Sequence, residues 1–253
     1  MSRLGRTLQL LTAERQDRLV AAEQALRSPL PVIRRVAFAS LAGGNGCSTV
    51  ASRIATALAS RRAGGVLLVL AAGEDRRAEQ LVAEGGRHHS ARGIETIALP
   101  DPVWPGGIDN WRTHTEEQHR AHELTLTDWG KLPTAQLFAV AAHSHLVCLT
   151  TTTERGAVQR TLDVAGALTE AGTQTLIVAS SVRGRARLGA RRMVTALPTP
   201  AQLMPFDPNA RLVAGAAVNS ASQLALAELG GAIVAACARA NSPATSQQLA
   251  VAR

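Results

Sequence analysis

The chain has 253 residues with 46% hydrophobic content, which is enough for one large domain with a sizeable core. Three Phe, three Trp and no Tyr are too few aromatic side chains for stacked recognition of single-stranded nucleic acid. No run of 18 apolar residues and no signal-peptide pattern occurs, and the three cysteines are typical of reduced thiols, so we expect a cytoplasmic protein. The net charge is +8, and Lys131 is the only lysine.

Residues 1–31 are predicted to form a basic, amphipathic N-terminal helix. Apolar side chains recur at helical spacing between residues 3 and 27, and Pro29 and Pro31 end the pattern. Two interpretations are open: residues 3–27 make peripheral contact with a partner or an anionic membrane surface, or the helix packs on the body of the domain. The apolar stripe consists of Leu4, Leu8, Leu11, Leu19, Ala22 and Leu26.

Residues 32–240 alternate between apolar strand patterns and helical patterns, which predicts an α/β fold with a doubly wound, mostly parallel sheet flanked by helices. Residues 85–123, rich in His, Pro and Gly, are predicted to be a long and partly mobile excursion with one strand at 93–100. Residues 241–253 are predicted to be a flexible tail. We expect further strands at 32–42, 66–72, 122–130, 146–152, 173–181 and from 201, and helices at 44–65, 134–145, 154–172, 183–197 and 221–240.

The segment "LAGGNGCSTV", residues 41–50, follows the first predicted strand and opens a helical stretch. Its glycines would let backbone N–H groups converge on phosphate oxygens at a helix N-terminus. Ser48 is a candidate Mg²⁺ ligand, and Thr49 is a candidate helix cap. The segment lacks a lysine to meet the phosphate charge. The candidate nucleotide-binding residues here are Gly43, Gly44, Asn45, Gly46, Cys47, Ser48 and Thr49.

This segment resembles the deviant Walker A motif of the MinD/ParA family of P-loop ATPases, KGGxGK followed by a hydroxyl residue and Thr. Two later segments extend the resemblance over about residues 32–240. In "LTDWG", Asp128 resembles the aspartate that ends the family's Walker B strand, and "LMPFDPNARLVAG" is similar to the family's Pro-x-Asp segment near the adenine, which places Pro205 and Asp207 there. The resemblance implies a P-loop fold, ATP or ADP with Mg²⁺ held through Ser48 and Asp128, and a homodimer or heterodimer.

Three departures from the family pattern remove charge. The family's signature lysine falls at Ala42, and the P-loop lysine falls at Cys47. The aspartate that positions the attacking water falls at Ala71 or Ala72, with Glu74 and Asp75 out of register. In addition, the asparagine that contacts adenine is replaced by Ser180 or Ser181. The resemblance therefore implies a degenerate member that hydrolyses ATP poorly or not at all.

Four other features of the sequence each allow more than one interpretation. Lys131 is either a relocated phosphate contact or a solvated loop lysine. Cys47 is either a reactive thiol of lowered pKa at a helix N-terminus or a small residue filling the lysine position. His114, His119 and His122, with Glu117 and Glu123, are either metal ligands on one helix face or part of a solvated helix or loop. The basic segment 183–192 is a DNA-binding footprint, a surface for an acidic partner, or an ordinary arginine-rich face. Its arginines are Arg183, Arg185, Arg187, Arg191 and Arg192.

The leading hypothesis is a non-hydrolysing MinD/ParA-like scaffold that acts as an accessory or positioning factor, in a secretion or pilus machine, through dimerisation or a protein partner. Two alternatives are a slow ATP-binding and ATP-hydrolysing member of the family and a ParA-like protein that binds DNA without sequence preference.

Overall fold

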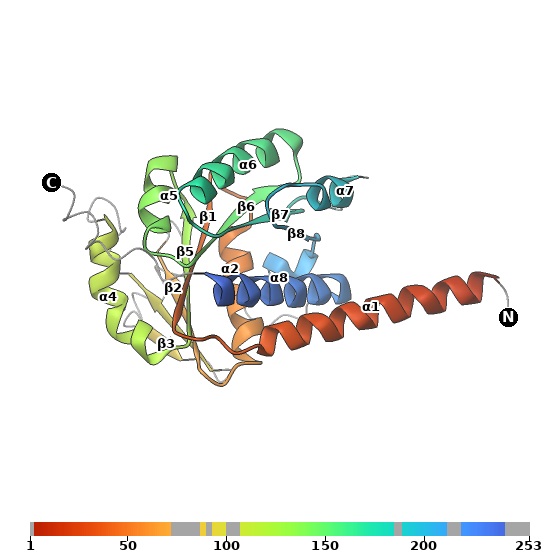
Figure 1. The fold of residues 1–253 in the computed structure, drawn as a ribbon, viewed down its shortest axis with the longest axis horizontal. Coiled ribbons are helices and arrows are strands. Elements are labelled where there is room, and N and C mark those ends of the chain that lie inside the picture. The colour runs from red at the N-terminus through yellow and green to blue at the C-terminus, as the bar shows by residue number, and fades with distance from the viewer. Residues whose placement is uncertain are drawn as a thin grey trace.

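The computed structural model describes residues 3–71, 87–89, 93–99, 107–184, 189–211 and 219–240, with the backbone alone for residues 3–12, 89, 210 and 211. Within these ranges the chain forms one sheet with helices on both faces (Figure 1). The predicted α/β, doubly wound class is confirmed. Its buried strands read as continuous apolar runs because both of their faces are covered.

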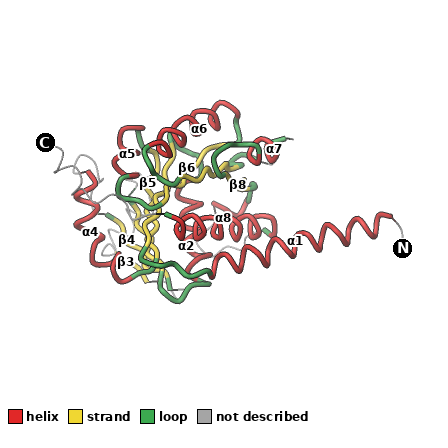
Figure 2. The backbone as a smooth tube through the Cα atoms, viewed as in Figure 1, coloured by secondary structure: helices red, strands yellow, loops and turns green. Residues whose placement is uncertain are grey.

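The sheet has eight strands in the order β3-β4-β2-β5-β1-β6-β7-β8. All neighbouring pairs are parallel except β3 and β4, which are antiparallel at one edge. The strands run side by side between the two helical layers (Figure 2). Their bounds are β1 Arg34–Ser40, β2 Val66–Leu70, β3 Arg87–His89, β4 Ile94–Ala98, β5 Leu124–Lys131, β6 Leu146–Thr152, β7 Thr175–Ser180 and β8 Ala201–Met204.

Two apolar clusters cover the two faces of the sheet. Because side chains alternate along a strand, Val36 and Phe38 of β1 face one cluster, and Ala37 and Ala39 face the other. Helices α1 (Arg3–Arg27), α2 (Cys47–Ala59) and α8 (Ser220–Arg239) contribute to the first cluster. Helices α4 (Gly107–Ala121), α5 (Thr134–Ala141) and α6 (Arg155–Glu170) contribute to the second.

The predicted N-terminal helix is confirmed over Arg3–Arg27. Ala22 and Leu26 are buried against α8, where Gly230 and Gly231 leave room for the close approach. Arg18 pairs with Glu228 at 2.5 Å. The N-terminal part of α1 extends away from the body in Figure 1. Of the two interpretations, packing on the domain body therefore holds for the C-terminal half of the helix.

The interpretation of residues 85–123 as a mobile excursion with a single strand is wrong in part. Residues 107–121 form α4, and β3 joins β4 at the sheet edge. Trp111 of α4 is 2% exposed and lies 5.7 Å from the Trp129 ring, with the Arg35 guanidinium 5.5 Å from its centroid. The sequence did not predict this helix, because its charged outer face makes the segment polar on average and masks the buried face that Trp111 marks.

Two further helices differ from expectation. The basic helix predicted over 183–197 is short: α7 comprises only Ala190–Thr195 and begins after Gly189 in the left-handed region at φ 92°. Helix α8 is long and apolar enough to cross a membrane, yet 67% of its most apolar stretch is buried inside the protein. It is a core helix, and in the described ranges it alone meets that length and composition. The predicted tail 241–253 lies outside the described residues.

Candidate functional site

The glycine segment forms a loop between β1 and α2, as its sequence predicts. Gly44 and Gly46 adopt φ angles of 75° and 80°, which side-chain-bearing residues rarely adopt. Helix α2 begins at Cys47, and Gly46 is its N-cap without a side-chain hydrogen bond. The predicted cap by Thr49 is therefore wrong. The first N–H groups of α2 have no partner within the helix, so the loop keeps the geometry of an anion cradle.

Cys47 occupies the floor of this loop rather than its mouth. Its side chain is 6% exposed and lies against Asp128 and Thr150. Burial raises the pKa of the Cys47 thiol well above its usual range, and the neighbouring Asp128 charge raises it further. Of the two interpretations of Cys47, the reactive thiol of lowered pKa is wrong, because burial and the carboxylate outweigh the helix N-terminus. The thiol is a neutral filler of the lysine position.

Asp128 lies beneath the loop, near the carboxyl end of β5, and is fully buried. Its Oδ1 accepts a hydrogen bond of 3.0 Å from the Gly130 N–H. Ser48 is in the first turn of α2, next to Cys47, so the two predicted metal-side residues belong to neighbouring elements. One hydroxyl and one carboxylate suit Mg²⁺, which keeps several waters and shares phosphate oxygens with a nucleotide. Ser48 and Asp128 are thus suitable donors for a magnesium–nucleotide complex, and neither Ala42 nor Cys47 supplies a cation to it.

Lys131 is the last residue of β5 and is exposed. Its Cα is paired in register with Ser40 at the end of β1. This position favours the interpretation as a solvated loop lysine. Ala42, at the signature-lysine position, is exposed and its carbonyl accepts a hydrogen bond of 2.9 Å from the Ser40 hydroxyl. Of the residues at the missing water-positioning aspartate, Ala71 is buried, and Ala72, Glu74 and Asp75 lie outside the described residues.

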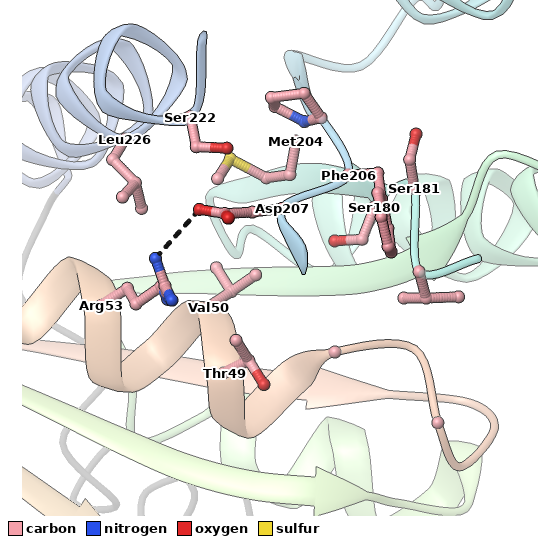
Figure 3. A pocket seen from close by; sticks show the side chains of 14 residues that line it. Thr49, Val50, Arg53, Ser180, Ser181, Met204, Phe206, Asp207, Ser222 and Leu226 are labelled. Carbon is pink, nitrogen blue, oxygen red and sulfur yellow. Dashed lines mark hydrogen bonds and ion pairs between the residues drawn. The ribbon is translucent and has the colours of Figure 1, made fainter. Parts of the chain in front are cut away.

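A cavity of about 300 Å³ opens beside the loop (Figure 3). It is bounded by the loop and α2 on one side, by the ends of β7 and β8, and by the first turns of α8. Pro205 and Asp207 line it, as the resemblance implies, together with Gly44, Gly46 and Thr49. The structure thus brings the two distant sequence segments, 41–49 and 205–207, to one cavity.

Arg53 of α2 and Asp207 form the charged pair of the cavity (Figure 3). The Arg53 Nη1 lies 3.3 Å from Asp207 Oδ2, and the same guanidinium donates to the Asn209 carbonyl at 2.8 Å. Asp207 also accepts from the Asn209 N–H at 3.0 Å. No motif marks Arg53 in the sequence, although it follows Thr49 by one helical turn and so falls on the same face of α2.

Three serines line the same cavity. Ser180 and Ser181 follow one another at the end of β7, and Ser222 is in the first turn of α8. All three are buried, and within the described structure their Oγ atoms have no hydrogen-bond partner. Ser180 and Ser181 were noted as the replacement of an adenine-binding asparagine. No motif marks Ser222, which only the packing of α8 on the sheet brings here.

The remaining sequence candidates do not converge on one site. His119 is buried and hydrogen-bonded to Thr125 at 2.8 Å, whereas the His122 Nε2 lies 3.3 Å from Glu95. Burial lowers the pKa of His119 to about 4. His114 contacts the Asn110 carbonyl of its own helix. Over the described ranges, no group of three or more His, Cys, Asp and Glu residues could hold a metal ion.

The predicted basic patch is only partly described. Arg183, Arg191 and Arg192 are exposed, and Arg185 and Arg187 lie outside the described residues. Arg191 also lines a groove of about 660 Å³ between α1, α7, β8 and α8. The three described arginines therefore stand on the surface near the β8 edge of the sheet.

Comparison with known structures identifies the fold. The cell division ATPase MinD of Pyrococcus furiosus aligns with a TM-score of 0.57 at 16% identity, over 78% of this chain and 98% of its own. A putative plasmid partition protein of Borrelia burgdorferi, bound to AMPPNP, aligns at 0.57 and 13% over 80% and 98%. MinD in the MinC:MinD complex of Aquifex aeolicus aligns at 0.51 and 14% over 81% and 94%. No protein-family model and no curated protein matches the sequence. The protein has the fold of the MinD/ParA P-loop ATPases.

Proposed function

We propose that this protein is a MinD/ParA-fold protein that does not hydrolyse ATP efficiently and serves as a scaffold for a protein partner. The observation that carries the proposal is the neutral, buried Cys47 at the position of the P-loop lysine. Phosphoryl transfer concentrates negative charge on the transferred group, and this charge has to be met by cations and N–H groups. Here the loop offers N–H groups and a helix dipole alone.

The surroundings of Cys47 make the loss of charge more severe. Asp128, a fully buried carboxylate, lies against the Cys47 thiol, so the group nearest to the lysine position is acidic. The helix N-terminus contributes about 0.3–1 kcal/mol of attraction, which is small beside a charged hydrogen bond. Ala42 also leaves the signature-lysine position without a cation. ATP or ADP with Mg²⁺ held by Ser48 and Asp128 would thus bind weakly and remain intact.

The role as a scaffold follows from what the fold keeps. The sheet, the loop and the cavity beside it are all present in this chain. MinD of Aquifex aeolicus is found in a complex with MinC. For this chain we propose a homodimer or heterodimer, acting in the cytoplasm as an accessory or positioning factor, for instance of a secretion or pilus machine. The protruding part of α1 is the proposed contact to a partner or membrane.

Steady-state phosphate release separates this proposal from a slow ATPase. Wild-type protein is incubated with excess ATP and Mg²⁺, and Asp128→Asn serves as the matched control because it removes the metal-side carboxylate. We expect equal, blank-level release from both chains. Release that rises with wild-type concentration and is lost in Asp128→Asn would establish the slow ATPase instead.

A second candidate function is DNA binding without sequence preference, favoured by the exposed Arg183, Arg191 and Arg192. Binding through phosphates weakens steeply with salt. Fluorescence anisotropy with a random duplex, at increasing salt, compares the triple alanine variant with Arg155→Ala plus Arg160→Ala on α6. Salt-dependent binding lost only in the first variant would support this function.

A further inference from the structure

Strand β8 leaves one edge of the sheet open. It pairs with β7 alone, and α7 and α8 both contact it (Figure 2). The carbonyls of Pro200 and Met204 point toward the β7 side, where each accepts a hydrogen bond of 2.9 Å. Because successive residues of a strand direct their backbone groups to opposite edges, Ala201 and Leu203 direct theirs outward. Among the described residues, nothing pairs with the N–H and C=O groups of these two residues.

The open edge lies along a groove of about 660 Å³ between α1, α7, β8 and α8. Ala201 and Leu203 line it, Val194 of α7 lines one wall, and Leu224 of α8 lines another. An exposed strand edge is a template for pairing with another chain. A groove that combines such an edge with apolar walls suits an extended peptide, which adds a strand to the sheet and places alternate side chains against the two walls.

Five charged side chains line the groove, and two of them neutralise one another. Arg18 of α1 pairs with Glu228 of α8 at 2.5 Å, and the Gln202 side chain donates to the same carboxylate at 3.0 Å. These contacts join α1, β8 and α8 at the groove, and they match the charges of Arg18 and Glu228 within the protein. The full charged set is Glu14, Arg15, Arg18, Arg191 and Glu228.

The charges that remain favour an acidic peptide. The Arg15 guanidinium donates to the Ser220 carbonyl at 2.7 Å, and neither Arg15 nor Arg191 forms an ion pair with a described residue. The remaining carboxylate of the groove is Glu14, which is exposed on α1. Arg192, exposed on α7 beside Arg191, adds a further positive charge. A carboxylate on the peptide would thus meet more positive than negative charge along the groove.

We propose that the β8 edge binds a short acidic segment of a partner protein as an added β-strand. Backbone groups of this segment pair with those of Ala201 and Leu203, and its acidic side chains reach Arg15 and Arg191. Pro205, the next residue whose backbone would face outward, has no N–H, so the added strand is short. The role of this edge as a partner contact rests on the proposed scaffold function, whereas the binding itself requires no ATP.

Fluorescence anisotropy of the full chain with labelled octapeptides tests the charge preference. The acidic peptide alternates Val and Glu, and its matched control carries Gln in place of every Glu. We expect saturable binding of the acidic peptide and binding of the control that is weaker by about fivefold, because exposed ion pairs each contribute little. Added salt should reduce this difference, since it screens exposed charges.

Two further acidic peptides test the pairing of backbones. One carries N-methyl groups on its Val nitrogens and the other on its Glu nitrogens, and these nitrogens lie on opposite edges of an extended strand. Only one edge can face β8. One methylated peptide should therefore bind at least about tenfold more weakly than the parent, and the other within about twofold of it.

Variants of the chain locate the binding site. Arg15→Gln with Arg191→Gln should lower the affinity for the acidic peptide to that of the Gln peptide, whereas Arg155→Gln with Arg160→Gln, on the exposed face of α6, should leave it unchanged. Ala201→Pro removes one outward N–H and keeps the bonds to β7, so it should also weaken binding. The peptide comparisons on the wild-type chain decide the question even where a variant fails to fold.

Three results would overturn the proposal: no saturable binding of the acidic peptide up to about 1 mM, equal affinity for the acidic and Gln peptides, or equal affinity for the two methylated peptides. A dimer of the full chain in sedimentation equilibrium that Ala201→Pro dissociates would also overturn it, because a second copy would then occupy the edge. Any of these outcomes leaves the proposed function standing. ATP cleavage by the wild-type chain would refute that function and leave the peptide site intact.

Discussion

The loop and the cavity are two ends of one site, and they treat their polar groups in opposite ways. At the loop end, polar groups form hydrogen bonds within the protein: the Ser40 hydroxyl donates to the Ala42 carbonyl, and the Asp128 carboxylate accepts from the Gly130 N–H. The Cys47 thiol fills the space beneath the loop. At the cavity end, the Ser180 and Ser222 hydroxyls have no partner among the residues that the structure describes. The polar groups at the loop end are therefore hydrogen-bonded within the protein, whereas the cavity end has buried hydroxyls that no described residue pairs with.

The largest expected effect concerns the charged pair that frames the cavity. Arg53→Ala leaves the Asp207 carboxylate buried without its guanidinium, which should lower the free energy of unfolding by about 3 kcal/mol. Urea denaturation measures this change. The double variant Arg53→Ala with Asp207→Asn should recover part of the loss, since it removes the buried charge. A loss below about 1 kcal/mol in the single variant would mean that Asp207 is already well solvated.

The next effect tests the loop end directly. Cys47→Lys restores a cation beside Asp128, and we expect its affinity for ATP with Mg²⁺ to exceed that of Cys47→Ala at least tenfold, or about 1.4 kcal/mol. Titration calorimetry measures the affinity of both variants for ATP with Mg²⁺. Because both variants change the packing at residue 47, the difference between them reports the effect of the added charge. Equal affinities would show that a cation at residue 47 does not reach the phosphates, and that the loop differs from an active one in more than charge.

The smallest effect contrasts single hydroxyls at the two ends. Ser40→Ala removes a hydroxyl that donates to Ala42 and lies 3.3 Å from the Gly130 carbonyl, so it should destabilise the ligand-free protein by about 1 kcal/mol. Ser222→Ala removes a buried hydroxyl without a partner and should leave stability unchanged or raise it by up to about 1 kcal/mol. Thermal melts of the two variants show whether each substitution lowers or raises the stability of the protein. Destabilisation by Ser222→Ala of the size seen for Ser40→Ala would remove the contrast.

Much of the fold could be predicted from the sequence because its signals are local. The apolar runs that became β2, β6 and β7, the strand–loop–helix order around residues 41–49, and the helical stripe of α1 all depend on near neighbours. Helix α4 was missed because one buried face, marked by Trp111, stands against many charged residues. The length of α7 could not be predicted, since arginines are compatible with a helix but do not require one.

The site was predictable where it follows a motif and unpredictable where it follows packing. Gly43 to Thr49 and the segment of Asp207 were identified from their patterns, and the structure places Gly44, Gly46 and Thr49 with Pro205 and Asp207 at one cavity. Ser222 was not, because only the packing of α8 brings it to the cavity. Arg53 was not, because its partner Asp207 is 154 residues away in the sequence. The reactive-thiol interpretation of Cys47 could not be excluded from the sequence, which shows a helix N-terminus but does not show burial beside Asp128.

The most direct test of the central claim is a single-turnover experiment with the wild-type chain. Protein in excess over γ-labelled ATP and Mg²⁺ is incubated overnight, and the label is separated into ATP and free phosphate. Because every ATP molecule can meet a binding site, even very slow cleavage would accumulate. We predict that the label stays in ATP to the same extent as without protein. Conversion of the label to phosphate by the wild-type chain, and not by Asp128→Asn, would contradict the account.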